Sequence, residues 1–88
     1  MEYVYVLLCL KDSRFYTGYT KDLKQRIQAH TVGKVSTTRT RRPLKLVYYE
    51  ACLDQADALH RERYLKATWG KRYLRTRLKS YFAVEETT

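Results

Sequence analysis

The sequence predicts a small α+β domain in which a three-stranded sheet is flanked by helices, in the order ββ-α-β-α-α. The chain has 88 residues, which is room for one domain with one modest core. Three runs rich in β-branched and aromatic residues are typical of strands, and apolar residues recur at helical spacing between and after them. We expect residues 1–83 to form this single domain and residues 84–88 to form a disordered tail.

The N-terminal part of the chain predicts a β-hairpin. Residues 2–10 are almost continuously apolar, which predicts a strand that is buried on both faces. Residues 11–13 have the composition of a turn, and residues 14–19 predict the second arm of the hairpin.

A helix is expected after the hairpin, with Thr20 as its N-cap and His30 near its end. Leu23, Arg26, Ile27 and His30 share one stripe of this helix at helical spacing. The face that meets the sheet therefore carries an arginine and a histidine.

The second half of the chain predicts a loop, a strand and two helical segments. The polar, basic loop over residues 31–42 is too long for a simple connection, so we expect it to be either mobile or functional. Residues 44–52 predict the third strand, and Asp54 is expected to cap a helix that runs to about Thr68.

An apolar stripe with one carboxylate is expected along this last helix. Its members would be Ala58, Leu59, Glu62, Leu65 and Trp69. Gly70 is expected to break or bend the helix, which continues over residues 71–82 with arginines outward.

The charge of the chain points to an anionic partner. Eighteen Lys and Arg against nine Asp and Glu give a net charge of +9, and this surplus destabilises the compact state unless an anion is near. The basic residues cluster over 34–45 and 61–79. Nucleic acid is the first candidate partner and an anionic membrane surface the second. Nine scattered acids argue against a two-metal site built from several convergent carboxylates.

The cellular setting is inferred from the cysteines and from the apolar segments. Cys9 and Cys52 lack zinc or redox spacing and are expected to be buried and reduced. The apolar run at 4–10 is too short to span a bilayer, and no secretory signal is present. We therefore expect a cytoplasmic protein with no membrane contact.

Three residues of the hairpin are candidates for chemistry. If Leu7 pairs with Tyr16, then Tyr5 is the diagonal neighbour of Tyr16 on one face, although tyrosine is also an ordinary strand residue. Gly18 lies inside a strand, where it either allows another group to approach closely or marks a bulge.

Three residues of the helices complete the set. Arg26 either takes an anion such as a phosphate or reaches solvent from the edge of its stripe. His30 is a site residue or simply ends the helix. Glu62 needs a cation, which is Lys66, Arg26 or a bound metal, and a single carboxylate suits Mg²⁺.

These residues fall in an order that resembles the GIY-YIG nuclease superfamily. Residues 3–5 (Tyr-Val-Tyr) and 16–18 (Tyr-Thr-Gly) resemble its paired motifs, and residues 22–30 resemble its helix with a catalytic arginine and a histidine four residues on. Residues 58–62 with Lys66 resemble its later helix, which bears a metal-ligating glutamate. Residues 42–50 resemble the third strand of a small stand-alone branch related to the UvrC N-terminal domain.

This resemblance implies a metal-dependent endonuclease that hydrolyses phosphodiester bonds in DNA with little sequence specificity, using Mg²⁺ or Mn²⁺. It implies that Tyr5 is the general base, that Tyr16 orients the nucleophile or the scissile phosphate, and that Arg26 stabilises the transition state. It further implies that Glu62 holds the metal, and that His30 relays a proton or binds phosphate. The residues expected to hold the nucleic acid are Lys34, Arg39, Arg41, Arg42, Lys66, Lys71, Arg72 and Arg75.

Two alternatives to the enzyme stay open at this stage. The motifs depart from the family pattern at Tyr3 and Thr17, and the chain has no asparagine, which many family members carry after the glutamate helix. The first alternative is a non-catalytic nucleic-acid-binding module of the same fold, and the second is a basic accessory protein. DNA is the expected partner, with RNA as the alternative, and a protein partner is expected to supply targeting.

Overall fold

The order of elements confirms the predicted α+β class. The structure is a computed structural model that describes residues 1–87, so Thr88 lies outside the described residues. The described elements are β1 (Glu2–Cys9), β2 (Arg14–Thr20), α1 (Leu23–Thr31), the short 3₁₀ helix η1 (Arg39–Arg41), β3 (Leu44–Cys52), α2 (Gln55–Lys66), α3 (Thr68–Arg77) and α4 (Lys79–Thr87). The backbone is helical up to Thr87, where the sequence analysis expects a tail.

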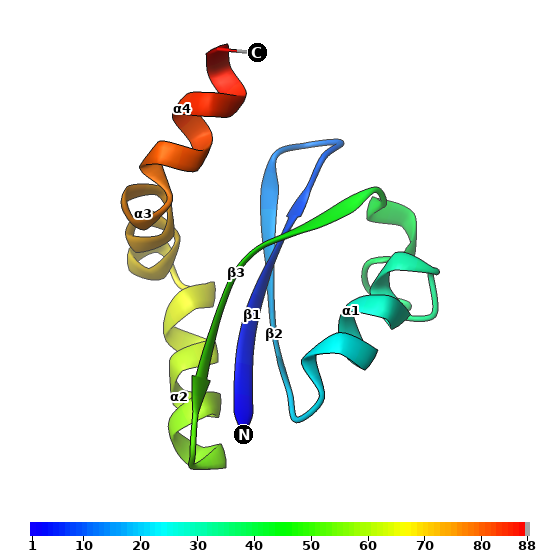
Figure 1. The fold of residues 1–88 in the computed structure, drawn as a ribbon, viewed down its shortest axis with the longest axis vertical. Coiled ribbons are helices and arrows are strands. Elements are labelled where there is room, and N and C mark those ends of the chain that lie inside the picture. The colour runs from blue at the N-terminus through cyan, green and yellow to red at the C-terminus, as the bar shows by residue number, and fades with distance from the viewer. Residues whose placement is uncertain (88) are drawn as a thin grey trace.

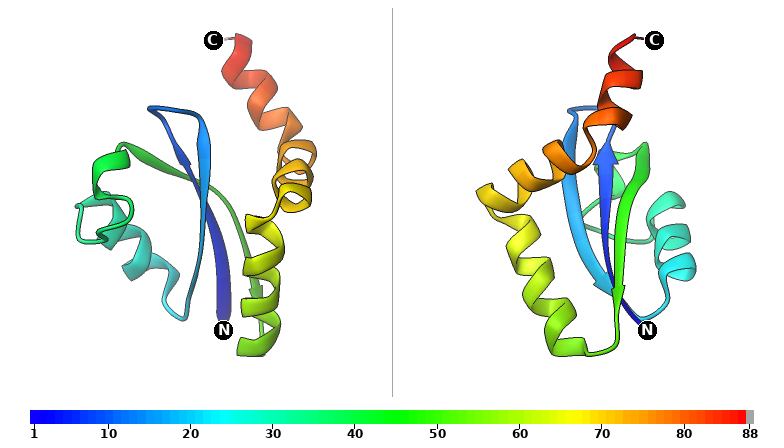
Figure 2. Two further views of the ribbon diagram at one scale, coloured as in Figure 1. Left: turned by 180° about the vertical axis from the view of Figure 1, so that it is seen from behind. Right: turned by 60° about the vertical axis from the view of Figure 1, so that its left-hand side comes forward.

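The hairpin strand β1 is the central strand of the sheet, in the order β2-β1-β3, and both pairings are antiparallel. This position explains why its sequence is apolar on both faces. The register pairs Leu7 with Tyr16, as predicted, and Tyr5 with Gly18. Helix α1 covers one face of the sheet, and α2 and α3 cover the other (Figures 1 and 2).

The hydrophobic core lies between the sheet and the α2–α3 pair. Val4 and Val6 of β1 pack against Ala58, Leu65 and Leu74, all of which are at most 2% exposed. Because successive strand residues point to opposite faces, the side chain of Tyr5 points instead toward α1. The core and the candidate site therefore use the two sides of one strand.

Helix α1 begins later than the sequence analysis expects. Its N-cap is Asp22, whose carboxylate accepts a hydrogen bond from the backbone N–H of Gln25. The hydroxyl of Thr20 accepts from the backbone N–H of Asp22 instead and shapes the turn before the helix. Thr20 is therefore not the cap.

The stripe predicted along α2 is correct at Ala58 and Leu65 but wrong at two positions. Leu59 is 38% exposed and Trp69 is 68% exposed. Helix α2 ends at Lys66 and the backbone is extended at Ala67, so Trp69 belongs to α3, which runs in a new direction.

The expectation that Gly70 breaks or bends a helix is wrong. Gly70 lies within α3, at the contact of this helix with α2. It is buried, and a Cβ at this position would overlap the carbonyl oxygen of Tyr64 and the backbone of Leu65. The glycine allows the start of α3 to pack directly on the last turn of α2.

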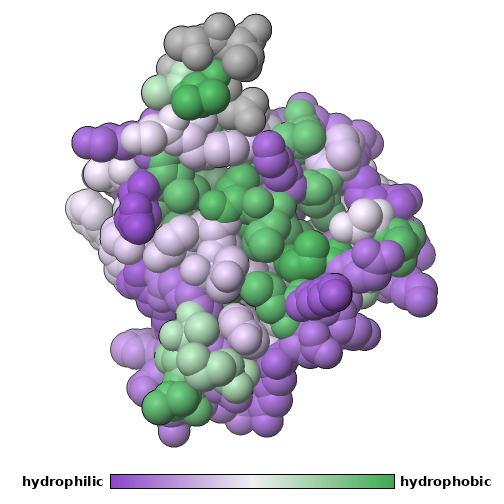
Figure 3. Space-filling view, viewed as in Figure 1, coloured by the Kyte–Doolittle hydropathy of each residue, from purple (hydrophilic) through white to green (hydrophobic). Residues whose placement is uncertain are grey.

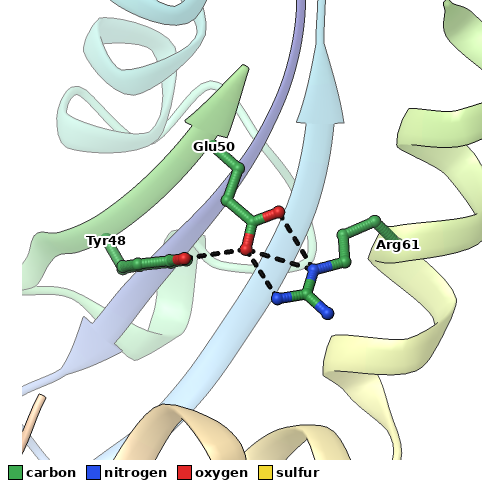
Figure 4. A network of polar contacts seen from close by, with 3 residues as sticks. All are labelled: Tyr48, Glu50 and Arg61. Carbon is green, nitrogen blue, oxygen red and sulfur yellow. Dashed lines mark hydrogen bonds and ion pairs between the residues drawn. The ribbon is translucent and has the colours of Figure 1, made fainter. Parts of the chain in front are cut away.

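A polar network ties β3 to α2 across the sheet edge (Figure 4). Glu50 accepts three hydrogen bonds from the guanidinium of Arg61, at 2.8–3.1 Å, and a fourth from the hydroxyl of Tyr48 at 2.7 Å. Burial alone would raise the pKa of Glu50, but the hydrogen bonds from Arg61 and Tyr48 outweigh it and the pKa is lowered.

The face shown in Figure 3 has hydrophobic side chains across its middle and hydrophilic ones around them. A hollow on the molecule is lined in part by Leu8, Leu10, Tyr81 and Phe82, from the hairpin and α4. Among the described residues no helix combines the length and hydrophobicity that a bilayer crossing requires.

Gly70→Ala tests the close contact between α2 and α3. An alanine ordinarily stabilises a helix by about 0.5–1 kcal/mol over glycine, but overpacking against backbone costs about 1–3 kcal/mol. We expect the free energy of unfolding, measured by urea denaturation, to fall by about 1–2 kcal/mol. Thr76→Ala, at an exposed position of the same helix, is the control and should change it by less than about 0.5 kcal/mol. A stabilised Gly70→Ala protein would contradict the contact.

Candidate functional site

The hydroxyl of Tyr5 is the centre of the candidate site. Tyr5 is 1% exposed, and its hydroxyl forms a hydrogen bond of 2.8 Å with Nε2 of His30. The Nε of Arg26 donates to the same oxygen at 3.3 Å. The predicted stripe of α1 thus does bring the arginine and the histidine onto the sheet, and both reach one phenol.

Gly18 creates the space for this phenol. A Cβ at position 18 would overlap the hydroxyl and the outer ring carbons of Tyr5. The pairing of β1 with β2 continues without a register shift through Gly18, so this glycine allows a close approach and does not form a bulge.

His30 is almost fully enclosed at 1% exposed. Its Nδ1 lies 2.7 Å from the hydroxyl oxygen of Thr38, and its Nε2 contacts Tyr5. Burial, and then the charge of Arg26, lower the pKa of His30, so the imidazole is neutral at pH 7. With both ring nitrogens engaged inside the protein, His30 is not placed to bind a phosphate, which leaves the proton relay of the two predicted roles.

Thr38 is a site residue that the sequence analysis missed. It lies in the basic loop at residues 31–42 and is 0% exposed. The loop folds back on α1 and ends in η1. Thr37, which precedes Thr38 in the loop, donates to the hydroxyl of Tyr16 at 3.4 Å. Part of this loop is therefore packed against the site. The only sequence signal was the loop's length.

Tyr16 and Arg26 form the more open side of the site. The ring of Tyr16 meets that of His30 edge-on, with centroids 5.3 Å apart. The hydrogen bond to Tyr5 raises the pKa of Arg26, and Tyr16 acts in the same direction. No carboxylate lies within ion-pair distance of Arg26 in the described part of the chain. This cation is therefore available to an external anion.

The phenol of Tyr5 is protonated at neutral pH. Burial raises its pKa, and the opposing effect of the Arg26 guanidinium does not offset this. The charges of Tyr16 and then of Glu62 act in the same direction as burial and raise the pKa of Tyr5.

Glu62 is paired with Lys66, one of the three partners that the sequence analysis considers. The Nζ of Lys66 lies 3.0 Å from Oε2 of Glu62, and the side chains are 54% and 17% exposed. No group of three or more His, Cys, Asp or Glu residues gathers in the described chain. A single carboxylate nevertheless fits Mg²⁺, which keeps several waters and takes substrate phosphates as further ligands.

Several of the residues predicted to bind nucleic acid already contact other groups of the protein. Arg75 donates to the carbonyl oxygen of Ser13, Arg42 donates to that of Arg39, and Arg72 lies over the ring of Trp69. Lys66 is engaged by Glu62. The exposed members of the predicted set are Lys34, Arg39, Arg42, Lys66, Lys71, Arg72 and Arg75, while Arg41 is half-buried.

The chain is similar to known proteins over most of its length. The family model described as the GIY-YIG catalytic domain matches residues 1–75. A UPF0213 protein of Clostridium perfringens is 48% identical over 67 residues, which cover 75% of this chain and 71% of that protein. A UPF0213 protein of Streptococcus pyogenes serotype M3 is 40% identical over 85 residues, covering 96% and 87%. The solution NMR structure of a UPF0213 protein from Bacillus halodurans superposes with a TM-score of 0.55 at 39% identity and covers 86% of this chain and 84% of that one.

The burial of His30 gives a prediction about stability and pH. Its folded-state pKa lies below the ordinary value of 6.5, so the unfolded chain takes up a proton first as the pH falls. Stability should therefore be complete above pH ~6.5 and decrease as the pH falls toward the lowered pKa. Urea unfolding at a series of pH values around and below this point would measure the change.

His60 provides a matched control, because it is exposed and is the only other histidine in the chain. We expect His30→Gln to remove the loss of stability between pH ~6.5 and the lowered pKa of His30, and His60→Gln to leave that loss in place. The opposite result would mean that His30 is not the titrating group.

Proposed function

This chain belongs to the GIY-YIG domain family, and we propose that it is a metal-dependent endonuclease that hydrolyses phosphodiester bonds in DNA with little intrinsic sequence specificity. The proposal is carried by one observation, the hydroxyl of Tyr5 held between the neutral imidazole of His30 and the guanidinium of Arg26. A proton acceptor thus adjoins a fixed cation that has no carboxylate partner among the described residues.

In the proposed reaction Tyr5 is the general base. Because its phenol is protonated at neutral pH, it can accept a proton from the attacking water only by passing its own proton on. The neutral His30 lies within reach at Nε2. In the tautomer that the proposal requires, Nδ1–H donates to the hydroxyl of Thr38 and Nε2 carries the lone pair that accepts the proton. The path of the proton is then from water to Tyr5 and on to His30.

In the proposed reaction Arg26, Tyr16 and Glu62 act on the phosphate and on its leaving group. Arg26 is the permanent charge of the site and would stabilise the negative charge that grows on the phosphoryl oxygens. Tyr16, on the open side, would orient the water or the scissile phosphate. A divalent ion, Mg²⁺ or Mn²⁺, held by Glu62 would supply positive charge at the leaving oxygen.

A non-catalytic DNA- or RNA-binding module of the same fold is the second candidate. The contact between Glu62 and Lys66 favours it, because the lysine occupies part of the carboxylate that a metal would use. In either case we place the protein in the cytoplasm, with a protein partner as the source of targeting.

Removing the proposed base should abolish cleavage while the fold remains. Tyr5→Phe keeps the buried ring and loses only the hydroxyl, and Arg26→Ala loses the fixed charge. We expect each to slow Mg²⁺-dependent plasmid nicking by at least roughly 10²-fold. Tyr49→Phe, at a half-exposed position on β3, is the control and should nick at the wild-type rate. Equal rates for Tyr5→Phe and wild type would remove Tyr5 from the chemistry.

The metal role of Glu62 is tested by titration. Glu62→Gln should slow nicking by roughly 10²-fold or more and raise the Mg²⁺ concentration needed for half of the residual rate. Asp57→Asn, an exposed acid on the same helix, should leave both unchanged. Nucleic-acid binding without metal-dependent nicking of any DNA form by the wild type would favour the binding module instead.

A further inference from the structure

A basic hollow of about 640 Å³ lies at the hairpin end of the sheet, away from the Tyr5 hydroxyl. It is formed where the hairpin turn, η1 and α3 come together. Four cations line it, and they come from three separate elements: Arg14, Arg41, Lys71 and Arg75.

Among the residues that line the hollow in the described part of the chain, cations outnumber carboxylates. Its one carboxylate is Asp12, whose oxygen accepts a hydrogen bond from the backbone N–H of Arg14 at 2.9 Å. That hydrogen bond lowers the pKa of Asp12, so it stays ionised at neutral pH. Four cations face one anion, and an external anion would reduce the repulsion between the cations.

One of the four cations is held in place before any ligand arrives. The guanidinium of Arg75 donates to the carbonyl oxygen of Ser13 at 3.0 Å. It also lies 4.8 Å from the ring centroids of both Phe15 and Phe82. An arginine that is stacked and bonded in this way loses little freedom when it contacts a phosphate.

The hollow is connected to the candidate site along the edge strand β2. Arg14 and Tyr16 lie two residues apart on this strand, so their side chains point to the same face. Two residues of a strand span ~6.5 Å, and one strand of DNA rises ~3.4 Å per nucleotide. A nucleic-acid strand with one phosphate at Tyr16 and Arg26 therefore has another phosphate, about two nucleotides along at this rise, within reach of Arg14.

We propose that the hollow binds a backbone phosphate of the same nucleic-acid strand that enters the Tyr5–Arg26 site, so that the strand runs along the edge of β2 toward the hairpin. This inference rests on the proposed function for the identity of the ligand. It adds a second phosphate site and a direction for the bound strand.

The test is binding in EDTA, where no metal-dependent cleavage occurs. A triple variant, Arg14→Gln with Arg41→Gln and Lys71→Gln, removes three of the four cations and leaves the stacked Arg75 in place. We expect its affinity for a fluorescent oligothymidylate of about eight nucleotides, measured by anisotropy, to fall by roughly ten-fold or more at low salt. The slope of log K against log salt should decrease by about 2, which is ~0.7 for each lost contact.

A second triple variant removes the same charge from exposed positions outside the hollow: Lys24→Gln, Arg63→Gln and Arg77→Gln. For this control, the slope of log K against log salt should change by less than half of the change seen for the hollow variant. Equal losses in the two variants would mean that only net charge matters, and unchanged binding by the hollow variant would also overturn the proposal.

The two proposals fail separately. If wild-type protein does not nick DNA with Mg²⁺ but the hollow variant still loses binding, the phosphate site stands and the nuclease does not. Near-ultraviolet circular dichroism of each variant confirms that a loss of binding is not a loss of fold.

Discussion

The candidate site depends on one close approach within the sheet, that of the Tyr5 ring to the backbone of Gly18. Because no Cβ is present at position 18, the outer end of the ring can lie over β2, the edge strand. Its hydroxyl there meets Arg26 and His30, which α1 brings to the same face of the sheet. The alternation along β1 directs Val4 and Val6 into the core on the other face. The strand that carries the core thus also fixes the position of the site.

Burial and one cation together determine the protonation of the site. Burial raises the pKa of Tyr5 and lowers that of His30, so both groups are neutral at pH 7. Arg26 counteracts burial at the phenol but reinforces it at the imidazole. A proton that moves from the hydroxyl of Tyr5 to Nε2 of His30 creates an imidazolium, and the phenol stays neutral only if it takes up a proton from water at the same time. The permanent charge of Arg26 remains for an anionic ligand.

The sequence predicted those features that depend on local pattern. The bounds of β3 were predicted correctly, and the apolar run of β1 correctly implied a strand that is buried on both faces. The stripe with Arg26 and His30 followed from helical spacing alone. The hairpin register singled out the Tyr5 phenol, and the helical stripe singled out the Arg26 guanidinium and the His30 imidazole, as candidates for the site.

The features that were missed depend on contacts between distant segments. Thr38 meets His30 only because the basic loop folds back, and nothing in its composition indicates that contact. The break after α2 occurs at Ala67, a good helix former, because Gly70 allows α3 to pack on the preceding turn. Once the helix changes direction there, Trp69 turns outward and the predicted stripe ends.

The pairing of Glu62 with Lys66 is compatible with a metal ligand as well as with a structural ion pair. A carboxylate that is 17% exposed requires a cation, and the nearest lysine on the same helix supplies one. Lys66 is 54% exposed, however, and an ion pair with so exposed a partner contributes only about 0–1 kcal/mol. A divalent ion that also contacts a bound phosphate would displace the lysine at little cost. The same weak pair would then orient Glu62 between substrates, and the displaced lysine would add one more cation for the nucleic-acid backbone.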